Sequence, residues 1–367
     1  MKVPMLDLRA QYATIKQEVV QAVGEVLDSQ LCCNGPDVRE FESEMAKYCD
    51  CARAVGVSSG TDALLCSLMA LEIGDGDEVV TTPFTFFGTA GAIWRTGARP
   101  VFADIRPETF NLDPEKVADA VTDRTKAIMP VHLFGQMVQM DPLLEIARER
   151  GLYVIEDAAQ AIGATQNGRK AGSLGTTGCL SFYPTKNLGA MGDAGMITTQ
   201  DESLAGVLES VRNHGQGEAY FHPRVGGNFR MDSVQAAVLS VKLRRLDDWT
   251  AARQANAARY DELLADCEQV VTPAVAEGNT HIYHQYTLRA RQRDELRQHL
   301  SQKGVAAGVY YPLCLHQQEC FASLGYSPGD FPAAEQAAAE VISLPVHPEL
   351  TDEQAEYVAE SICEFYG

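Results

Sequence analysis

Short apolar runs alternate with longer segments of helical periodicity from about residue 53 to residue 200. The β-rich runs are residues 53–57, 77–82, 99–104, 125–131, 152–157, 178–183 and 195–199, and helix-like segments separate most of them. Alternation of this kind predicts βαβ units and a mostly parallel sheet that is covered on both faces. The pattern therefore favours an α/β fold for this part of the chain.

Helical patterns precede and follow the predicted sheet. The first fifty residues are helical in pattern, and a long helical pattern from Met231 to Cys267 suggests a helix that leads out of the first lobe. Beyond Val270 a smaller α+β lobe is expected, closed by an amphipathic helix with Thr351 as its N-cap. We place a large domain at residues 1–245 and a small C-terminal domain at residues 246–367.

Composition and charge exclude several classes of protein. The chain has 367 residues and a formal net charge of −20 without a long basic run, which argues against binding to a nucleic-acid backbone. The longest charge-free stretch, Val79 to Trp94, is broken by Thr, Pro and Gly and indicates buried interior rather than a membrane span. The start of the chain lacks the apolar core of a secretory signal. We expect a cytoplasmic protein with no nucleic-acid or membrane partner.

The ten cysteines are scattered and form no CxxC pair, and no histidine pair has HExxH spacing. The sequence therefore predicts no metal site. Scattered cysteines suit a reducing compartment, where most act as small hydrophobic residues. No role follows from the sequence for the adjacent pair Cys32 and Cys33.

The segment "SSGTDAL", residues 58–64, lies between a predicted strand and a predicted helix. Gly60 permits close approach of a backbone, and Thr61 offers a hydroxyl beside the free N–H groups of a helix N-terminus, which can bind an anion. Ordinary helix capping is the alternative interpretation. Neither GxxxxGK[ST] nor GxGxxG occurs anywhere, so a Rossmann dehydrogenase is the weaker alternative.

Two further segments could contact a ligand. "VIEDAAQAIGA", residues 154–164, places Asp157 at the carboxyl end of an apolar strand, where open α/β sheets bind ligands. An acid in this position could instead cap the next helix. The aromatic residues Phe84, Phe86 and Phe87 are compatible with core packing or with a ring stacked on a planar heterocycle.

One lysine, Lys186, lies in the glycine-rich segment "SFYPTKNLGAMGDAG", residues 181–195. Taken alone, it could be a surface charge, a phosphate ligand or a covalent catalyst. Together with "SSGTDAL", "EDAAQAIGA" and "GGNFRMDSVQAAVL", in this order, the segment resembles the DegT/StrS family of sugar aminotransferases. The resemblance extends from "LDLRAQY" to "SLPVHPELT". It implies the type I aminotransferase fold, with a large domain and a smaller C-terminal one, and pyridoxal 5′-phosphate (PLP) as cofactor.

The resemblance also implies roles for individual residues around the cofactor. Lys186 would bind PLP covalently, and Asp157 would bind the protonated ring nitrogen. The remaining cofactor contacts would be Phe86 stacked on the ring, Gln160 beside it, Ser181, Gly60 and Thr61 at the phosphate, and Asn228 reaching that phosphate from the neighbouring subunit of a homodimer. The active sites would then be shared between subunits.

For the substrate, the resemblance implies a keto-sugar linked to UDP or dTDP, with glutamate as amino donor. The chain looks closest to enzymes that aminate a UDP-linked 3-keto-hexuronic acid, in which the arginine at the position of Arg230 would hold the carboxylate. The other candidate substrate contacts are Thr185, Tyr310, Tyr311, Arg224 and His316. A 4-keto-sugar or cyclitol aminotransferase and a non-catalytic PLP-binding sensor remain as alternatives.

Three positions depart from the family pattern. Ile162 stands where many members have His, Cys314 replaces a common Pro, and Tyr310 stands where related enzymes often have His. These changes concern the substrate side and leave the expected cofactor contacts in place.

Overall fold

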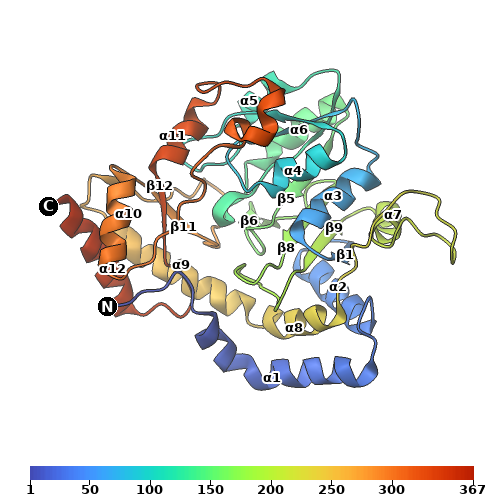
Figure 1. Cartoon of the computed structure of the whole chain (residues 1–367), viewed down its shortest axis with the longest axis horizontal. Helices are drawn as coiled ribbons and strands as arrows, with labels where there is room; N and C mark the ends of the chain where they lie inside the picture. The colour runs from blue at the N-terminus through green and yellow to red at the C-terminus, as the bar shows by residue number, and fades with distance from the viewer.

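The computed structural model describes residues 1–367 and contains a central sheet of seven strands (Figure 1). In spatial order the strands are β1 (Arg53–Val57), β9 (Gly195–Thr199), β8 (Thr177–Ser181), β5 (Tyr153–Asp157), β4 (Thr125–Ile128), β2 (Glu78–Thr81) and β3 (Arg99–Phe102). Only β9 runs antiparallel to its neighbours, β1 and β8. The predicted mostly parallel sheet is therefore confirmed.

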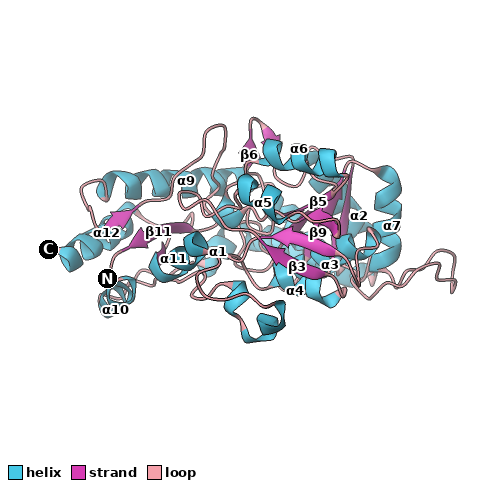
Figure 2. Cartoon of the chain, turned by 90° about the horizontal axis from the view of Figure 1, so that it is seen from above, coloured by secondary structure: helices cyan, strands magenta, loops and turns pink.

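Helices cover both faces of this sheet, because alternate side chains of each strand enter two separate cores. One core contains α2 (Pro36–Tyr48), α5 (Pro114–Ala120), α6 (Met140–Arg150) and α8 (Ser233–Leu243). The other contains α3 (Gly60–Ala70), α4 (Gly88–Arg95) and α7 (Glu202–Arg212). Figure 2 shows the strands between α6 on one side and α3 and α4 on the other.

The long helical pattern from Met231 to Cys267 does not form one helix. The structure has α8 up to Leu243 and then α9 (Leu246–Leu263), with a break at Arg244 and Arg245. α8 packs against α1 (Leu8–Ser29) and α2 in the large lobe, whereas α9 packs against α12 (Asp352–Tyr366). The polar and apolar pattern continues across the break, but the break allows α8 to pack in the large lobe and α9 in the small lobe. A single straight helix could not make both sets of contacts.

The smaller lobe is built on a three-stranded antiparallel sheet of β10 (Val270–Val271), β11 (Tyr286–Ala290) and β12 (Val341–Leu344). α9, α10 (Arg293–Gln302) and α12 pack around it. Thr351 caps α12 in a capping box with Gln354, as the sequence predicts. At the other end of the chain, Val3 pairs with Val305 and is buried in this core, so the N-terminus joins the small lobe (Figure 1).

The segment from Cys314 to Val341 returns to the large lobe. Its 3₁₀ turns (Leu315–Gln317 and Glu319–Leu324) and α11 (Pro332–Glu340) pack with aromatic residues of the β2–β4 region in one apolar cluster. The two lobes are thereby joined along an extended contact. The remaining elements are the hairpin β6 (Thr165–Gln166) and β7 (Arg169–Lys170) and a 3₁₀ turn at Leu133–Gly135. Across the chain, no helix combines the length and the apolar character that crossing a membrane requires.

Candidate active site

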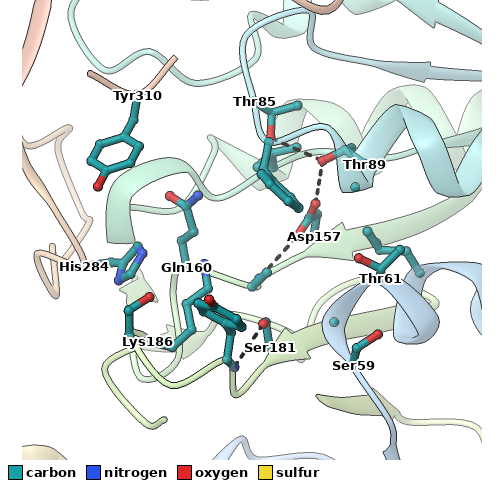
Figure 3. Close-up of a pocket in the computed structure, with 18 of the residues that line it drawn as sticks. Ser59, Thr61, Thr85, Thr89, Asp157, Gln160, Ser181, Lys186, His284 and Tyr310 are labelled. Carbon is teal, nitrogen blue, oxygen red and sulfur yellow. Dashed lines mark hydrogen bonds between the residues drawn. The ribbon is translucent and has the colours of Figure 1, made fainter. Parts of the chain in front are cut away.

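A cavity of about 660 Å³ opens at one edge of the central sheet, between the two lobes. The ends of β1, β5 and β8 and the start of β9 meet at this edge, because Gly195 pairs with both Val57 and Ser181. The cavity is lined by most of the residues that the sequence singles out: Gly60, Thr61, Phe86, Asp157, Gln160, Ser181, Thr185, Lys186, Tyr310 and Tyr311 (Figure 3). The carboxyl-end rule for α/β sheets thus locates the cavity correctly.

One end of the cavity is formed by the start of α3. The N-cap of this helix is Ser59, whose Oγ accepts a hydrogen bond from the Asp62 N–H at 3.1 Å. Thr61 is therefore free of the capping role and lines the cavity instead. A Cβ on Gly60 would lie 2.6 Å from the Cβ of Ser181, so only glycine lets α3 approach β8 this closely. Unpaired N–H groups and two hydroxyls converge here, as an anionic group requires.

Asp157 ends β5 inside the cavity and is only 5% exposed. Its carboxylate accepts hydrogen bonds from Thr89 Oγ1 at 2.8 Å and from the Ala159 N–H at 3.2 Å. Burial raises the pKa of Asp157, and Thr89, Ala159 and the Lys186 charge only partly oppose this effect. No helix follows directly, since residues 158–164 form turns, so Asp157 caps none. This carboxylate is suited to a cationic partner in the cavity.

The neighbouring acid, Glu156, points to the opposite face of the sheet and is fully buried. It accepts bonds from the N–H groups of Gly172, Leu174 and Gly175 and from His132 Nε2 at 2.8 Å. Burial alone would raise the pKa of Glu156, but these hydrogen bonds outweigh burial and hold it below the ordinary value. Glu156 is therefore a satisfied structural acid, and Asp157 is the one available to a ligand.

Lys186 lies across the cavity on the loop that follows β8. Desolvation lowers the pKa of its amine to about 8, although the nearby Asp157 carboxylate opposes this shift. A large share of the amine is then neutral, and nucleophilic, at mildly alkaline pH. The loop is anchored from two sides: Asn187 Nδ2 donates to the Ile282 carbonyl at 3.0 Å, and the buried Lys242 amine donates to the Gly189 carbonyl.

The model of the DegT/DnrJ/EryC1/StrS aminotransferase family matches residues 13–363. The chain belongs to this aminotransferase family. The expected fold is confirmed as well, because the structure of a DegT DnrJ EryC1 StrS aminotransferase from Brucella abortus superimposes with a TM-score of 0.96 at 37% identity, covering 100% of both chains. The structure of DesV from S. venezuelae superimposes with a TM-score of 0.97 at 41% identity, covering 99% of this chain and 98% of that one. Members of this family are PLP-dependent sugar aminotransferases, as expected from the sequence.

Curated relatives match the chain over nearly its full length. A "pleiotropic regulatory protein" of Geobacillus stearothermophilus is 52% identical, covering 100% of this chain and 99% of the relative. A UDP-N-acetyl-3-dehydro-α-D-glucosamine 3-aminotransferase of Acidithiobacillus ferrooxidans is 42% identical, with 97% and 96% covered. A UDP-2-acetamido-2-deoxy-3-oxo-D-glucuronate aminotransferase of Pseudomonas aeruginosa is 40% identical, with 95% and 96% covered.

The donor set of the cavity fits the aminotransferase cofactor. PLP has a phosphate, a ring nitrogen that can be protonated, a ring oxygen and a carbonyl carbon that reacts with an amine. The α3 end suits the phosphate, Asp157 suits the ring nitrogen, and Lys186 is the only lysine lining the cavity. Gln160 is fixed by two hydrogen bonds: its Oε1 accepts from the Phe134 N–H at 2.8 Å, and its Nε2 donates to the Tyr311 hydroxyl at 3.0 Å. Its side chain lies in the cavity between Asp157 and Lys186.

The aminotransferase cavity also contains residues to which the sequence gave no role. Those with polar side chains are Ser59, Thr85, Thr89, Tyr183, Asp193, His284 and Gln285. Thr85 and Thr89 lie in and beside the aromatic run of residues 84–87. Two hydroxyls four residues apart at the start of a helix can lie on the same face, and this spacing could have indicated that both belong to the site. His284 comes from the small lobe, and hydrogen bonds from α9 and from Asn187 hold its segment near Lys186. No local pattern identifies such a residue.

Four candidate residues lie outside the cavity of their own chain. Asn228 is exposed, and Arg230 donates from Nη1 to Asn213 Oδ1 at 2.7 Å. Arg224 is exposed on the preceding loop. His316 is buried, with Nε2 3.1 Å from Glu335 Oε1 and its ring against Phe331. Of the departures from the family pattern, Ile162 and Cys314 are both buried core residues.

The pKa of Lys186 generates a testable prediction. Desolvation lowers the pKa of the Lys186 amine, whereas the negative charge of Asp157 raises it because that charge stabilises the protonated amine. In the cofactor-free protein we expect half-maximal labelling of Lys186 by an amine reagent near pH 8, and in Asp157→Asn we expect the midpoint to move to lower pH.

The matched control is Glu145→Gln, which removes an exposed carboxylate on α6 and should leave the midpoint in place. Peptide mapping by mass spectrometry at each pH gives the Lys186 titration directly. An unchanged midpoint in Asp157→Asn would show that the two groups are not electrostatically coupled.

Proposed function

We propose that this aminotransferase moves an amino group from an amino acid, glutamate in the simplest case, to a keto-sugar linked to UDP or dTDP. The observation that carries the proposal is that Lys186 and Asp157 share one cavity with the anion-binding start of α3. A covalently held PLP needs all three. The product would be an amino-sugar for a surface polysaccharide or a related glycan.

In the proposed reaction, bound PLP supplies an electron-withdrawing ring that makes the α-hydrogen of the amino acid acidic. Asp157 accepts the hydrogen bond of the ring N–H and so keeps that nitrogen protonated. Lys186 Nζ, released when the amino acid binds, would take the α-proton as base and then, as acid, deliver it to the cofactor carbon that bears the transferred nitrogen. Gln160, held by its hydrogen bond to Tyr311, would bind the ring oxygen, and Phe86 would cover the ring. The same groups then act in reverse on the keto-sugar.

We propose a homodimer in which the partner subunit's Asn228 completes the phosphate site. The proposed dimer is supported by the position of Asn228, which is exposed and does not line the cavity of its own chain. The loop before it carries large exposed apolar side chains, with Tyr220 92% and Val225 83% exposed. Such a cluster on a folded protein favours an interface. Ser59, Thr61 and Ser181 would hold the phosphate from within the chain.

For the substrate, we propose a UDP-linked 3-keto-hexuronic acid, as in the relative from P. aeruginosa. Lys186 is the only cationic side chain that lines the cavity, so a sugar carboxylate would need a cation from outside it, and the partner subunit's Arg230 is the candidate. Thr185, Tyr310 and Tyr311 would complete the sugar pocket. We assign no sugar contact to His316, because its ring is buried against Glu335 and Phe331.

A neutral 3-keto-sugar is the second candidate, since the A. ferrooxidans relative is named for one and Tyr310 replaces the histidine expected for uronic acids. A 4-keto-sugar, a cyclitol and a regulatory role without catalysis are further alternatives. The regulatory name of the G. stearothermophilus relative is the observation that favours the last of these.

Lys186→Ala tests the aminotransferase reaction. The variant should lose the visible absorbance of lysine-bound cofactor and all turnover, because no other lysine lines the cavity. In the unaltered protein, borohydride reduction followed by peptide mapping should place the cofactor on Lys186. A label on Lys170, whose amine instead donates to the Tyr48 carbonyl, would contradict the assignment.

Mixed dimers of Lys186→Ala and Asn228→Ala chains test the shared site. One site of each mixed dimer would carry both lesions and the other neither, so free exchange should restore about one quarter of full activity. Each variant alone should be impaired. No recovery, with subunit exchange proven by mass spectrometry, would show that Asn228 acts within its own chain.

Arg230→Lys tests the substrate carboxylate. A compact ammonium cannot form two parallel hydrogen bonds to a carboxylate, so kcat/KM for the uronic substrate should fall about ten- to a hundredfold, a loss of about 1.5–3 kcal/mol. The half-reaction with glutamate and the turnover of a neutral 3-keto-sugar serve as internal controls and should barely change. Faster turnover of the neutral sugar by the unaltered enzyme would overturn the uronic assignment alone.

A further inference from the structure

His284 reaches the cavity from the small lobe on a tightly held segment that precedes β11. Arg253 Nη1 donates to the Tyr283 carbonyl at 3.1 Å, Gln254 Nε2 to the His281 carbonyl at 3.0 Å, and Asn187 Nδ2 to the Ile282 carbonyl at 3.0 Å. The segment is thus fixed both to α9 and to the Lys186 loop. Figure 3 shows His284 beside Lys186, at the end of the cavity opposite Ser59 and Thr61.

The hydrogen bonds of Asn187 determine the tautomer of His284. Because Asn187 Nδ2 donates to a backbone carbonyl, its Oδ1 is the atom that lies 3.2 Å from His284 Nδ1. An amide oxygen can only accept, so Nδ1 must carry the hydrogen. In a neutral imidazole the lone pair is then on Nε2. Nε2 has no hydrogen-bond partner in the chain and is not sealed in the interior, so its lone pair is available to the cavity.

The ring is also kept neutral. Desolvation, followed by the charges of Lys186 and Arg253, holds the pKa of His284 well below its ordinary value. A ring in this state accepts a hydrogen bond without taking the proton. His284 Nε2 is therefore a fixed acceptor beside Lys186.

We propose that His284 is a positioning residue whose Nε2 accepts a hydrogen bond from the Lys186 amine once the bound substrate has released that amine from the cofactor. The inference rests on the proposed function, in which Lys186 alternates between a cofactor-bound and a free state. No bond is made or broken by His284, and the proton stays on Lys186 Nζ. The interaction would hold the amine at the reacting end of the cavity and prevent it from swinging toward Asp157.

Two substitutions separate this role from a structural one. In His284→Asn, the amide NH₂ replaces Nδ1–H and keeps the bond to Asn187, but nothing replaces the acceptor at Nε2. In His284→Gln, the amide oxygen can replace Nε2, but the bond to Asn187 is lost. We expect His284→Asn to slow the single-turnover half-reaction of the holoenzyme with saturating glutamate about tenfold, with little change in KM, and His284→Gln to retain most of the rate.

A role limited to anchoring Asn187 predicts the reverse order, with His284→Gln the slower variant. That order, or an unchanged rate in His284→Asn, would overturn the inference. Borohydride reduction and peptide mapping of the same preparations distinguish a failure of the proposed function from a failure of the role given to His284. If the cofactor is found on another lysine, the proposed function fails; if it is found on Lys186 while His284→Asn reacts normally, only the role of His284 fails.

The tautomer provides a readout that does not depend on turnover, and a variant is needed only to assign the signal. In holoenzyme labelled with ¹⁵N-histidine, the long-range ¹H–¹⁵N spectrum should show His284 with a protonated Nδ1 and a bare Nε2 between pH 6 and pH 8. The His284→Gln spectrum, which lacks that signal, gives the assignment. A protonated Nε2 or a charged imidazolium would overturn the inference.

Discussion

Two adjacent carboxylates, Glu156 and Asp157, enter the interior at the end of β5, and an ionised group in such a place must be compensated by partners. Because neighbouring side chains of a strand point to opposite faces, the two acids meet different surroundings. Glu156 receives three backbone N–H groups and His132. Asp157 receives one hydroxyl and one N–H, which leaves lone pairs directed into the cavity. Because Asp157 has fewer hydrogen-bond partners than Glu156, its carboxylate can still accept hydrogen bonds from a cationic ligand.

The topology of the sheet brings the start of α3 and the Lys186 loop to the same cavity as Asp157. β9 returns antiparallel between β1 and β8, so the segment after Lys186 is carried back past the start of α3. A Cβ on Gly195 would lie 2.4 Å from the backbone of Ser59, and this close approach requires glycine. The anion-binding end and the lysine loop are consequently parts of one rigid unit. A cofactor bound there would be held at both ends by the large lobe, while the small lobe contributes His284 and Tyr310 to the reacting end.

The sequence predicts the parts of this site that depend on local pattern. Strands alternating with helices place Asp157 and Ser181 at the carboxyl edge, and motif order distinguishes Lys186 from an ordinary loop lysine. Residues that depend on long-range packing escape such reasoning. His284 is held near Lys186 by the anchoring of its segment to α9 and to Asn187. His316 has the chemistry of an anion ligand, but its burial with Glu335 is set by the fold of residues 315–335. The break between α8 and α9 likewise follows from the two lobes that they serve.

The charges of the cavity connect the substrate to the oligomeric state. Asp157, Asp193 and Lys186 are the charged side chains of the lining, in a chain of net charge −20. The α3 N-terminus offers one anion site, and the phosphate of PLP would occupy it. Apart from Lys186, the cavity lining of a single chain would offer no cationic side chain to an anionic nucleotide-sugar. In the proposed homodimer the partner subunit's Arg230, two residues from the exposed Asn228, would supply such a cation. On this electrostatic argument, a lone subunit could bind cofactor yet could not compensate the charge of the sugar substrate.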